Sequence, residues 1–257
     1  MEVLTFLVSG LISLVSPTGV IVDRVAESQI RKQLVSAEQL QVRIDNAPSH
    51  QLIQGRVDRV RVAGRGLFPL KEFRIDTLEL DTDPIFFNLR TRKLQRPLQA
   101  AARIVLTEKD INQALQSPTV TKRLRNLGIR FLQRREAQAA ERYDFLNLNV
   151  TFLPQNRIRV QGELQEQGYP DTLKIVAEAD PKIINGRSLQ LDNLKITANG
   201  QATPDVITRA IATRIAERFD LRQLEPSGTL ARILNFKIED STLQLATFIQ
   251  IRSSVEK

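Results

Sequence analysis

The sequence predicts an α+β fold built on a strongly curved, bulged antiparallel sheet. A six-residue pattern, apolar-Asp-x-apolar-x-apolar, occurs at residues 57–62, 75–80 and 191–196, each time inside a segment that alternates like a strand. The apolar residues occupy one parity before each Asp and the other parity after it. Because strand side chains alternate faces, an extra residue must be inserted there to keep the apolar side on the core, as in a β-bulge. Bulges curve a sheet around an interior; the alternative is that they only shape an ordinary barrel or sandwich core.

Four helical stretches are predicted between the strands, one of them the Arg-rich stretch at residues 119–142. Apolar spacing favours a helix from about residue 20 to 40, and Thr107 caps a short helix with acidic residues in its first turn. The clearest helix opens at Thr203-Pro204-Asp205, a cap followed by proline. Its predicted buried face comprises Val206, Ile207, Ala210, Ile211, Ile215 and Phe219. No long polar linker interrupts the chain, so residues 23–257 are expected to form a single α+β domain.

Residues 1–22 form a separate apolar segment. Residues 3–22 carry no charge and are numerous enough to cross a bilayer. However, Ser16-Pro17-Thr18-Gly19 is a turn signal, and a helix before it would have one aliphatic and one hydroxyl-bearing face. The segment is therefore expected to associate with a membrane, and spanning it, lying on it or packing into the fold all remain open. The protein is expected to be membrane-associated, on a side that the sequence does not fix.

The charge balance points to an anionic partner. The formal net charge is +8, which suits phospholipid headgroups, nucleic acid or an acidic protein. With no Trp and two Tyr, the chain lacks the aromatic platforms of single-strand binding, so no nucleic acid partner is expected. The Arg-rich stretch 119–142 is either a solvated helix face or a patch that meets anionic headgroups. The headgroup candidates are Lys122, Arg123, Arg125, Arg134 and Arg135.

The search for catalytic chemistry finds little. The chain has no cysteine and a single histidine, His50, in a turn context, so neither a Cys-type metal site nor a His cluster is expected. Phosphate-binding glycine loops, nucleophile elbows and zinc-protease motifs are absent from the sequence. The protein is therefore expected to be no enzyme, with no metal and no cofactor.

Several segments resemble the LmeA-like phospholipid-binding family. They are residues 42–58, with Pro48 and Gln54-Gly55, the glycine pair Gly64 and Gly66, residues 78–84, and the stretch Leu-Thr-Glu-Lys-Asp-Ile-Asn at 106–112. The resemblance covers nearly the whole chain. It implies a tubular lipid-binding type of fold, in which a bent antiparallel sheet wraps a long helix around an apolar tunnel. It also implies phospholipid binding and a role in the cell envelope or its membranes, without catalytic residues.

The leading hypothesis is a membrane-associated phospholipid-binding or lipid-transfer protein that holds acyl chains in an apolar groove. Expected partners are phospholipid and a membrane surface; a protein partner is not identified. The groove candidates are Leu98, Ala100, Ala102, Ile104, Leu148, Val150, Ile207, Ile211 and Ile215. Their periodicity does not distinguish a tunnel wall from plain core. The alternative function is a structural or accessory envelope protein that docks an acidic partner through its Arg face.

Overall fold

The computed structural model describes residues 23–46, 54–88, 90–91, 93–125, 143–166 and 170–253. The chain divides into two compact units. Unit 1 comprises Met1–Leu106, Leu221–Asn235 and Gln244–Lys257, and unit 2 comprises Thr107–Asp220 and Phe236–Leu243. The strands β13 (Thr229–Glu239) and β14 (Thr242–Ile251) each contribute residues to both units, and the expectation of a single domain over residues 23–257 stays a prediction.

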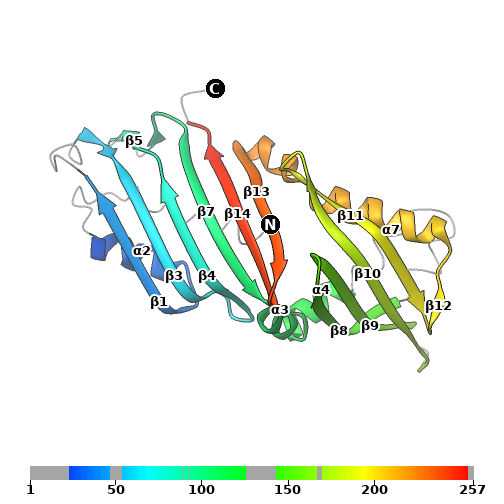
Figure 1. The fold of residues 1–257 in the computed structure, drawn as a ribbon. Coiled ribbons are helices and arrows are strands. Elements are labelled where there is room, and N and C mark those ends of the chain that lie inside the picture. The colour runs from blue at the N-terminus through cyan, green and yellow to red at the C-terminus, as the bar shows by residue number, and fades with distance from the viewer. Residues whose placement is uncertain are drawn as a thin grey trace. The chain divides into compact units, whose positions relative to one another are not determined.

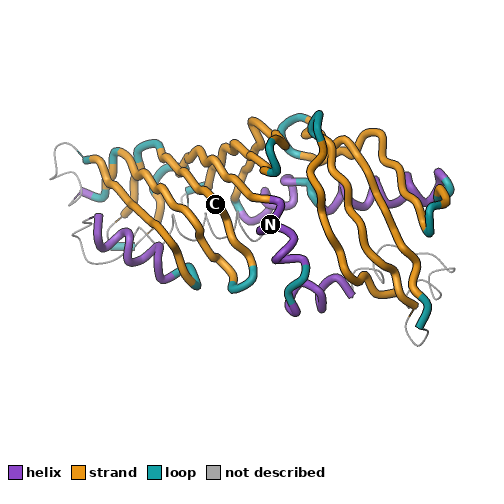
Figure 2. The backbone as a smooth tube through the Cα atoms, turned by 60° about the horizontal axis from the view of Figure 1, so that its bottom comes forward, coloured by secondary structure: helices purple, strands orange, loops and turns teal. Residues whose placement is uncertain are grey.

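Unit 1 is built on a six-stranded antiparallel sheet (Figure 1). Its strands, in spatial order, are β1 (Ser36–Asp45), β3 (Arg59–Leu70), β4 (Phe73–Thr82), β7 (Leu98–Thr107), β14 (Thr242–Ile251) and β13. A small three-stranded sheet contains β2 (Arg56–Val57), β5 (Ile85–Asn88) and β6 (Lys93–Leu94). The unit also contains helix α2 (Asp23–Lys32) and the 3₁₀ helix η2 (Leu221–Ser227). Figure 2 shows α2 running beside the strands.

The core of unit 1 is well packed. Ala26 and Ile30 lie one turn apart on α2 and are buried against the sheet, while Glu27 and Arg31 form an i,i+4 ion pair at 3.2 Å. Leu67, Ile75, Leu98 and Ile249 are among the most deeply buried side chains. The helix predicted to reach about residue 40 ends at Lys32, because Leu40 and Val42 alternate into this core from β1, which pairs with β3.

Unit 2 is built on a five-stranded antiparallel sheet. Its strands, in spatial order, are β12 (Gln201–Ala202), β11 (Ser188–Ala198), β10 (Thr172–Ile184), β9 (Arg157–Glu166) and β8 (Tyr143–Leu153). Its helices are α3 (Glu108–Leu115), α4 (Pro118–Arg125) and α7 (Asp205–Arg218). The sequence Leu153-Pro154-Gln155-Asn156 predicts a hairpin turn. The structure confirms this turn, because Gln155 and Asn156 both take positive φ between β8 and β9.

Of the three predicted bulges, the third is confirmed. The β10–β11 pairing shifts register between Glu178 and Asp180, and Asn193, inside the third copy of the pattern, has φ +50°. The inserted residue places Leu191 and Ile196 on the same face of the sheet, although one has an odd and the other an even position in the strand.

The first two copies achieve the same change of face differently. At Asp58 the strand breaks, so that β2 ends at Val57 in the small sheet and β3 begins at Arg59 in the large one. At the second copy both Ile75 and Leu78 are buried, yet the β3–β4 pairing keeps one register there. That pairing shifts instead between Leu67 and Leu70, next to Gly66 with φ +55°.

The predicted α+β class is confirmed, with antiparallel sheets dominating the described residues and no closed barrel among them. The wrapping of a long helix by a curved sheet stays a prediction. Within the described ranges, no helix is both long and apolar enough to cross a bilayer. The apolar segment 1–22 lies outside the described residues.

Candidate functional site

The five-stranded sheet of unit 2 carries a continuous apolar face. Residues directly opposite one another in adjacent strands share a face, and Val150, Val160, Ala177 and Ile196 form one such row across β8 to β11. The neighbouring rows are Phe152, Ile158 and Ala179, then Gly162, Ile175 and Ala198, then Leu164 and Leu173. We call these residues, with Leu148, the apolar face.

The apolar face is incompletely covered. Val150, Ala179 and Ile196 are buried, but the other larger side chains are half-buried and Leu173 is 38% exposed. In unit 1, by contrast, Leu80 and Ala102 on the core side of the sheet are each 4% exposed. A contiguous half-exposed apolar surface on a sheet is typical of a binding surface for an apolar ligand.

The opposite face of the same sheet is charged. Arg159 lies opposite Glu178 in the register and donates to it at 2.7 Å, and Arg157 donates to the same carboxylate at 2.8 Å. These hydrogen bonds, that from Arg159 first, lower the pKa of Glu178 below its usual range. Because side chains alternate along each strand, the sheet has one face of ion-paired residues and one face of aliphatic residues.

A bulge in β8 shapes the apolar face. The β8–β9 pairing shifts register between Leu146 and Asn149, and Asn147 has φ +51°. The bulge turns Leu148 over the backbone of Gly162: a Cβ built on that glycine would lie 2.5 Å from Leu148 Cδ2. A side chain at position 162 would therefore have to displace Leu148, and its Cβ would also lie 3.1 Å from Leu146 O, so glycine is favoured there. The groove candidates Leu148 and Val150 thus both lie on the apolar face.

Helix α3 holds the edge strand of this sheet. Asn112 brackets one residue of β8, since its Oδ1 accepts from Val150 N at 2.7 Å and its Nδ2 donates to Val150 O at 2.8 Å. Glu108 accepts from Phe152 N at 2.7 Å. Thr107 caps the helix as predicted, accepting from Asp110 N at 3.0 Å. Side chains from the stretch at 106–112 thus form hydrogen bonds with the free edge of β8, the last strand of this sheet.

Helix α7 packs against β11, and none of its residues is buried. Ile211 and Ile215 are half-buried. The prediction of a single buried face over the whole helix was wrong for four residues: Val206, Ile207, Ala210 and Phe219 are exposed. The reason is that α7 packs mainly on β11, so that only the side of the helix facing this strand is covered. Thr203, predicted as its cap, instead donates its hydroxyl to Ile196 O at 3.1 Å.

The remaining groove candidates lie in unit 1. Leu98, Ala100, Ala102 and Ile104 follow one face of β7 and are at most 4% exposed, in the core cluster with Leu78 and Leu80. Of the nine candidates, four thus lie in the core of unit 1 and five lie in unit 2, on β8 and α7. Of these five, Val150 is buried, Ile207 is exposed and the other three are half-buried.

Of the headgroup candidates, Lys122 is exposed on α4. Arg123 and Arg125 belong to the same helix, but their side chains are outside the described set, and Arg134 and Arg135 lie outside the described residues altogether. His50 lies outside them as well. Among the residues that the structure does describe, no cluster of His, Cys, Asp or Glu could hold a metal ion.

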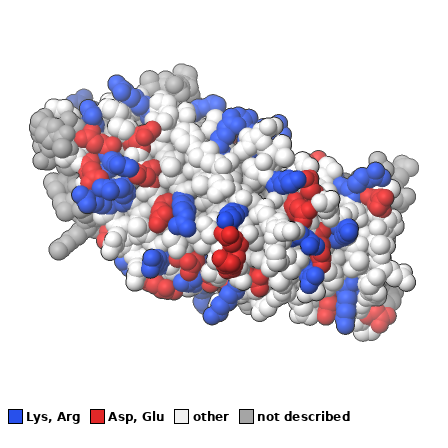
Figure 3. All heavy atoms as spheres, in the orientation of Figure 1, with Lys and Arg blue, Asp and Glu red and all other residues white. Residues whose placement is uncertain are grey.

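The solvent face of the unit 1 sheet bears a balanced set of charges. Arg43 and Arg61 both bind Asp45 across β1 and β3, and Arg59 binds Asp81 across β3 and β4. Arg61 is the main cause of a lowered pKa at Asp45, as Arg59 is at Asp81. Figure 3 shows such acidic and basic side chains interspersed.

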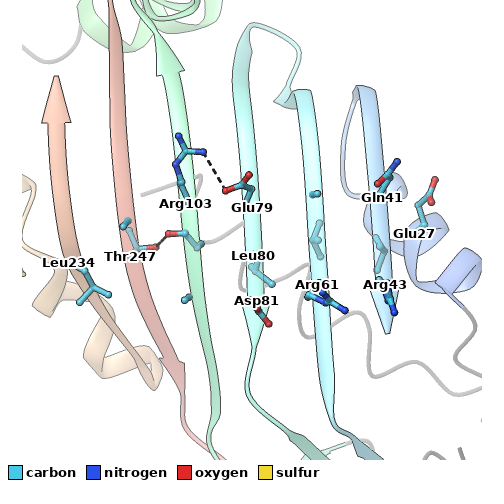
Figure 4. Close-up of a pocket in the computed structure, with 16 residues that line it drawn as sticks. Glu27, Gln41, Arg43, Arg61, Glu79, Leu80, Asp81, Arg103, Leu234 and Thr247 are labelled. Atoms are coloured by element: carbon cyan, nitrogen blue, oxygen red, sulfur yellow. Dashed lines mark hydrogen bonds and ion pairs between the residues drawn. The ribbon is translucent and has the colours of Figure 1, made fainter. Parts of the chain in front are cut away.

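An open hollow of about 810 Å³ lies along this sheet (Figure 4). Its exposed alanines, Ala63 and Ala101, sit among long charged side chains. Its lining contains three arginines and three acids, Arg43, Arg61, Arg103, Glu27, Glu79 and Asp81. Because these charges are equal in number, the hollow offers no excess of positive charge for an anion.

Comparison with known families identifies the chain. A sequence model of the LmeA-like phospholipid-binding family matches residues 16–248, nearly the whole chain. The chain belongs to the LmeA-like phospholipid-binding family. No curated protein and no solved structure matches it. Membership supports a lipid-binding role for this LmeA-like protein and confirms the resemblance read from its segments.

Sequence reasoning missed the residues that complete the apolar face. Ile158, Val160 and Ile175 alternate as any half-buried strand does, and nothing in their spacing shows that their shared face is left partly open. Only Gly162, a glycine within an alternating strand, was a signal of close packing.

Proposed function

We propose that this LmeA-like protein binds phospholipid by laying the acyl chains on the apolar face of the unit 2 sheet. The observation that carries the proposal is the half-exposure of that face, while the equivalent side of the unit 1 sheet is closed. The family match supports the ligand class. The proposal makes the sheet surface, rather than a polar pocket, the source of affinity.

The energetics favour such a surface without specific polar contacts. Each methylene moved from water to an apolar surface contributes ~0.8 kcal/mol, so roughly ten methylenes contribute ~8 kcal/mol. That gain offsets the loss of ligand freedom on binding, which is of the same order. Aliphatic side chains such as Val160 and Ile175 suit a flexible hydrocarbon chain because they offer contact area without a directional requirement.

Membrane association and transfer between membranes belong to the same proposal. A protein with an exposed aliphatic surface can take up a lipid most easily at a bilayer, because the acyl chains then pass from the membrane to the protein without entering water. The alternative of an envelope scaffold that docks an acidic partner is less supported, since the family to which the chain belongs is described by phospholipid binding.

The test is lipid retention by the full chain. The protein is purified without detergent and examined by native mass spectrometry, and lipid uptake is measured from vesicles of phosphatidylglycerol and phosphatidylethanolamine. Val160→Glu places a carboxylate on the apolar face, and Leu173→Glu does so at its exposed rim. Gln161→Glu adds the same charge to an exposed residue on the opposite face, as the matched control.

The proposal predicts phospholipid bound to the wild type and to Gln161→Glu, and at least tenfold less on Val160→Glu and Leu173→Glu. Leu173→Glu guards against a folding artefact, because a rim residue tolerates a charge and should leave the urea midpoint nearly unchanged. Equal lipid retention by all four proteins, or a wild type that neither carries nor takes up phospholipid, contradicts the proposal.

A further inference from the structure

Helix α7 carries an apolar strip that continues from the side packed on β11 to an exposed part at the first turns of the helix. Ile211 and Ile215 turn toward β11, while Val206 is 71% and Ile207 47% exposed at the first turns. An isolated exposed valine needs no explanation, but two adjacent exposed aliphatic side chains that extend the half-buried apolar strip of the same helix do.

The exposed side of α7 also has an ordered arrangement of charge. At 100° per residue, Val206, Ala210 and Ile207 span about 100° of the solvent side. Arg209 lies on one flank of this strip, and Arg218 lies on the other. Within the described part of the chain, neither arginine has an ion-pair partner, whereas Arg214 pairs with Glu217 at 3.4 Å.

Aliphatic residues flanked by arginines match the chemistry of a bilayer surface. At such a surface the aliphatic side chains enter the acyl boundary, and the arginine stems extend along it to place guanidinium groups among phosphates. A protein partner would also cover apolar residues. Arg209 beside them, and Arg218 about 17 Å beyond Ile207 along the same side of the helix, favour an anionic lipid surface instead.

We propose that the solvent side of α7, comprising Val206, Ile207, Arg209 and Arg218, is the surface through which the protein docks onto anionic phospholipid bilayers. This deepens the proposed function and rests on it, since α7 borders the sheet that carries the apolar face. Docking through α7 brings the edge of that sheet to the membrane that supplies its lipid.

The experiment measures binding of the full chain to vesicles of phosphatidylcholine, with and without phosphatidylglycerol. The chain contains no tryptophan, so Ile207→Trp introduces a single fluorescent reporter at the proposed contact. Its emission should shift to the blue when vesicles containing phosphatidylglycerol are added. A Val35→Trp reporter, at an exposed position of unit 1, should not shift.

Co-sedimentation tests the two chemical contributions separately. Arg209→Gln with Arg218→Gln should weaken binding to anionic vesicles about thirtyfold, at roughly fivefold per arginine. Val206→Ser with Ile207→Ser should weaken it at least tenfold. The control, Lys174→Gln with Lys195→Gln, removes the same charge from exposed positions on β10 and β11 and should change binding little.

The outcomes separate docking from lipid holding. Lost vesicle binding with phospholipid still retained in native mass spectrometry supports the α7 surface. Vesicle binding equal to wild type in both α7 variants overturns it, as does equal binding to neutral and anionic vesicles. If no variant carries lipid yet docking depends on α7, the proposed function fails and the docking surface stands.

Discussion

Asn112 offers the sharpest test of how the edge of the apolar sheet is held. Its amide bonds both backbone groups of Val150, with distances of 2.7 Å to the amide nitrogen and 2.8 Å to the carbonyl oxygen. Val150 is 7% exposed, so water has little access to these groups if the side chain is removed. Asn112→Ala therefore leaves a buried donor and a buried acceptor without partners.

The expected loss of stability follows from these two groups. An unsatisfied buried polar group costs ~1–3 kcal/mol, and half-exposed surroundings at Asn112 place each group near the lower limit. The better helix propensity of alanine returns roughly half a kcal/mol. Asn112→Ala should therefore lower the free energy of unfolding by about 2 kcal/mol.

The assay combines urea unfolding followed by circular dichroism with amide hydrogen exchange. The amide of Val150 should lose protection, while amides in the core of unit 1 should keep theirs. Gln113→Ala is the matched control, because Gln113 is the exposed neighbour on the same helix. If Asn112→Ala unfolds like Gln113→Ala and the Val150 amide stays protected, the side-chain bracket does not hold β8 and the reasoning is wrong.

Two further predictions concern packing and pH. Gly162→Ala should lower the free energy of unfolding by ~1–2 kcal/mol, because the added Cβ would lie 2.5 Å from Leu148 Cδ2. Urea titration measures this loss, and an unchanged midpoint would mean that Leu148 moves freely. The pKa of Asp81 is lowered in the folded state, chiefly by its hydrogen bond from Arg59, so its contribution to stability is present above its ordinary pKa and is lost as pH falls through the lowered value. The urea midpoint of Asp81→Asn should therefore fall less than that of wild type on acidification below about pH 4, and parallel curves would refute this role.

Local signals predicted several elements correctly. Thr107 with Asp110 predicted the start of α3, because a hydroxyl and a backbone amide three residues apart make the cap without help from distant parts of the chain. The turn around Gln155 and Asn156 is likewise local, since Asn tolerates positive φ. The parity change at residues 191–196 also predicted a real bulge, because a sheet with one apolar face forces its register.

Predictions failed where a distant partner decides the outcome. The residues from Ser36 to Leu40 were predicted as the end of a helix, but pairing with β3 makes them the first half of strand β1. The apolar residues of α7 have one spacing, but only contact with β11 determines that Ile211 is half-covered and Val206 is not. The cation-rich surface predicted from composition is largely neutralised in unit 1, because Arg59 and Asp81, distant in sequence, become cross-strand neighbours.

The sequence by itself determined the α+β class, the strands with their changes of apolar parity, the capped helix α3 and the family. These follow from periodicity and from short-range hydrogen bonding, which neighbouring residues carry. The tertiary structure alone decided which apolar surface is closed and which is open: Ala102 and Val160 alternate alike in sequence, yet one lies in a filled core and the other on a half-exposed sheet. Burial depends on the atoms packed against a face, and those atoms come from elements far away along the chain.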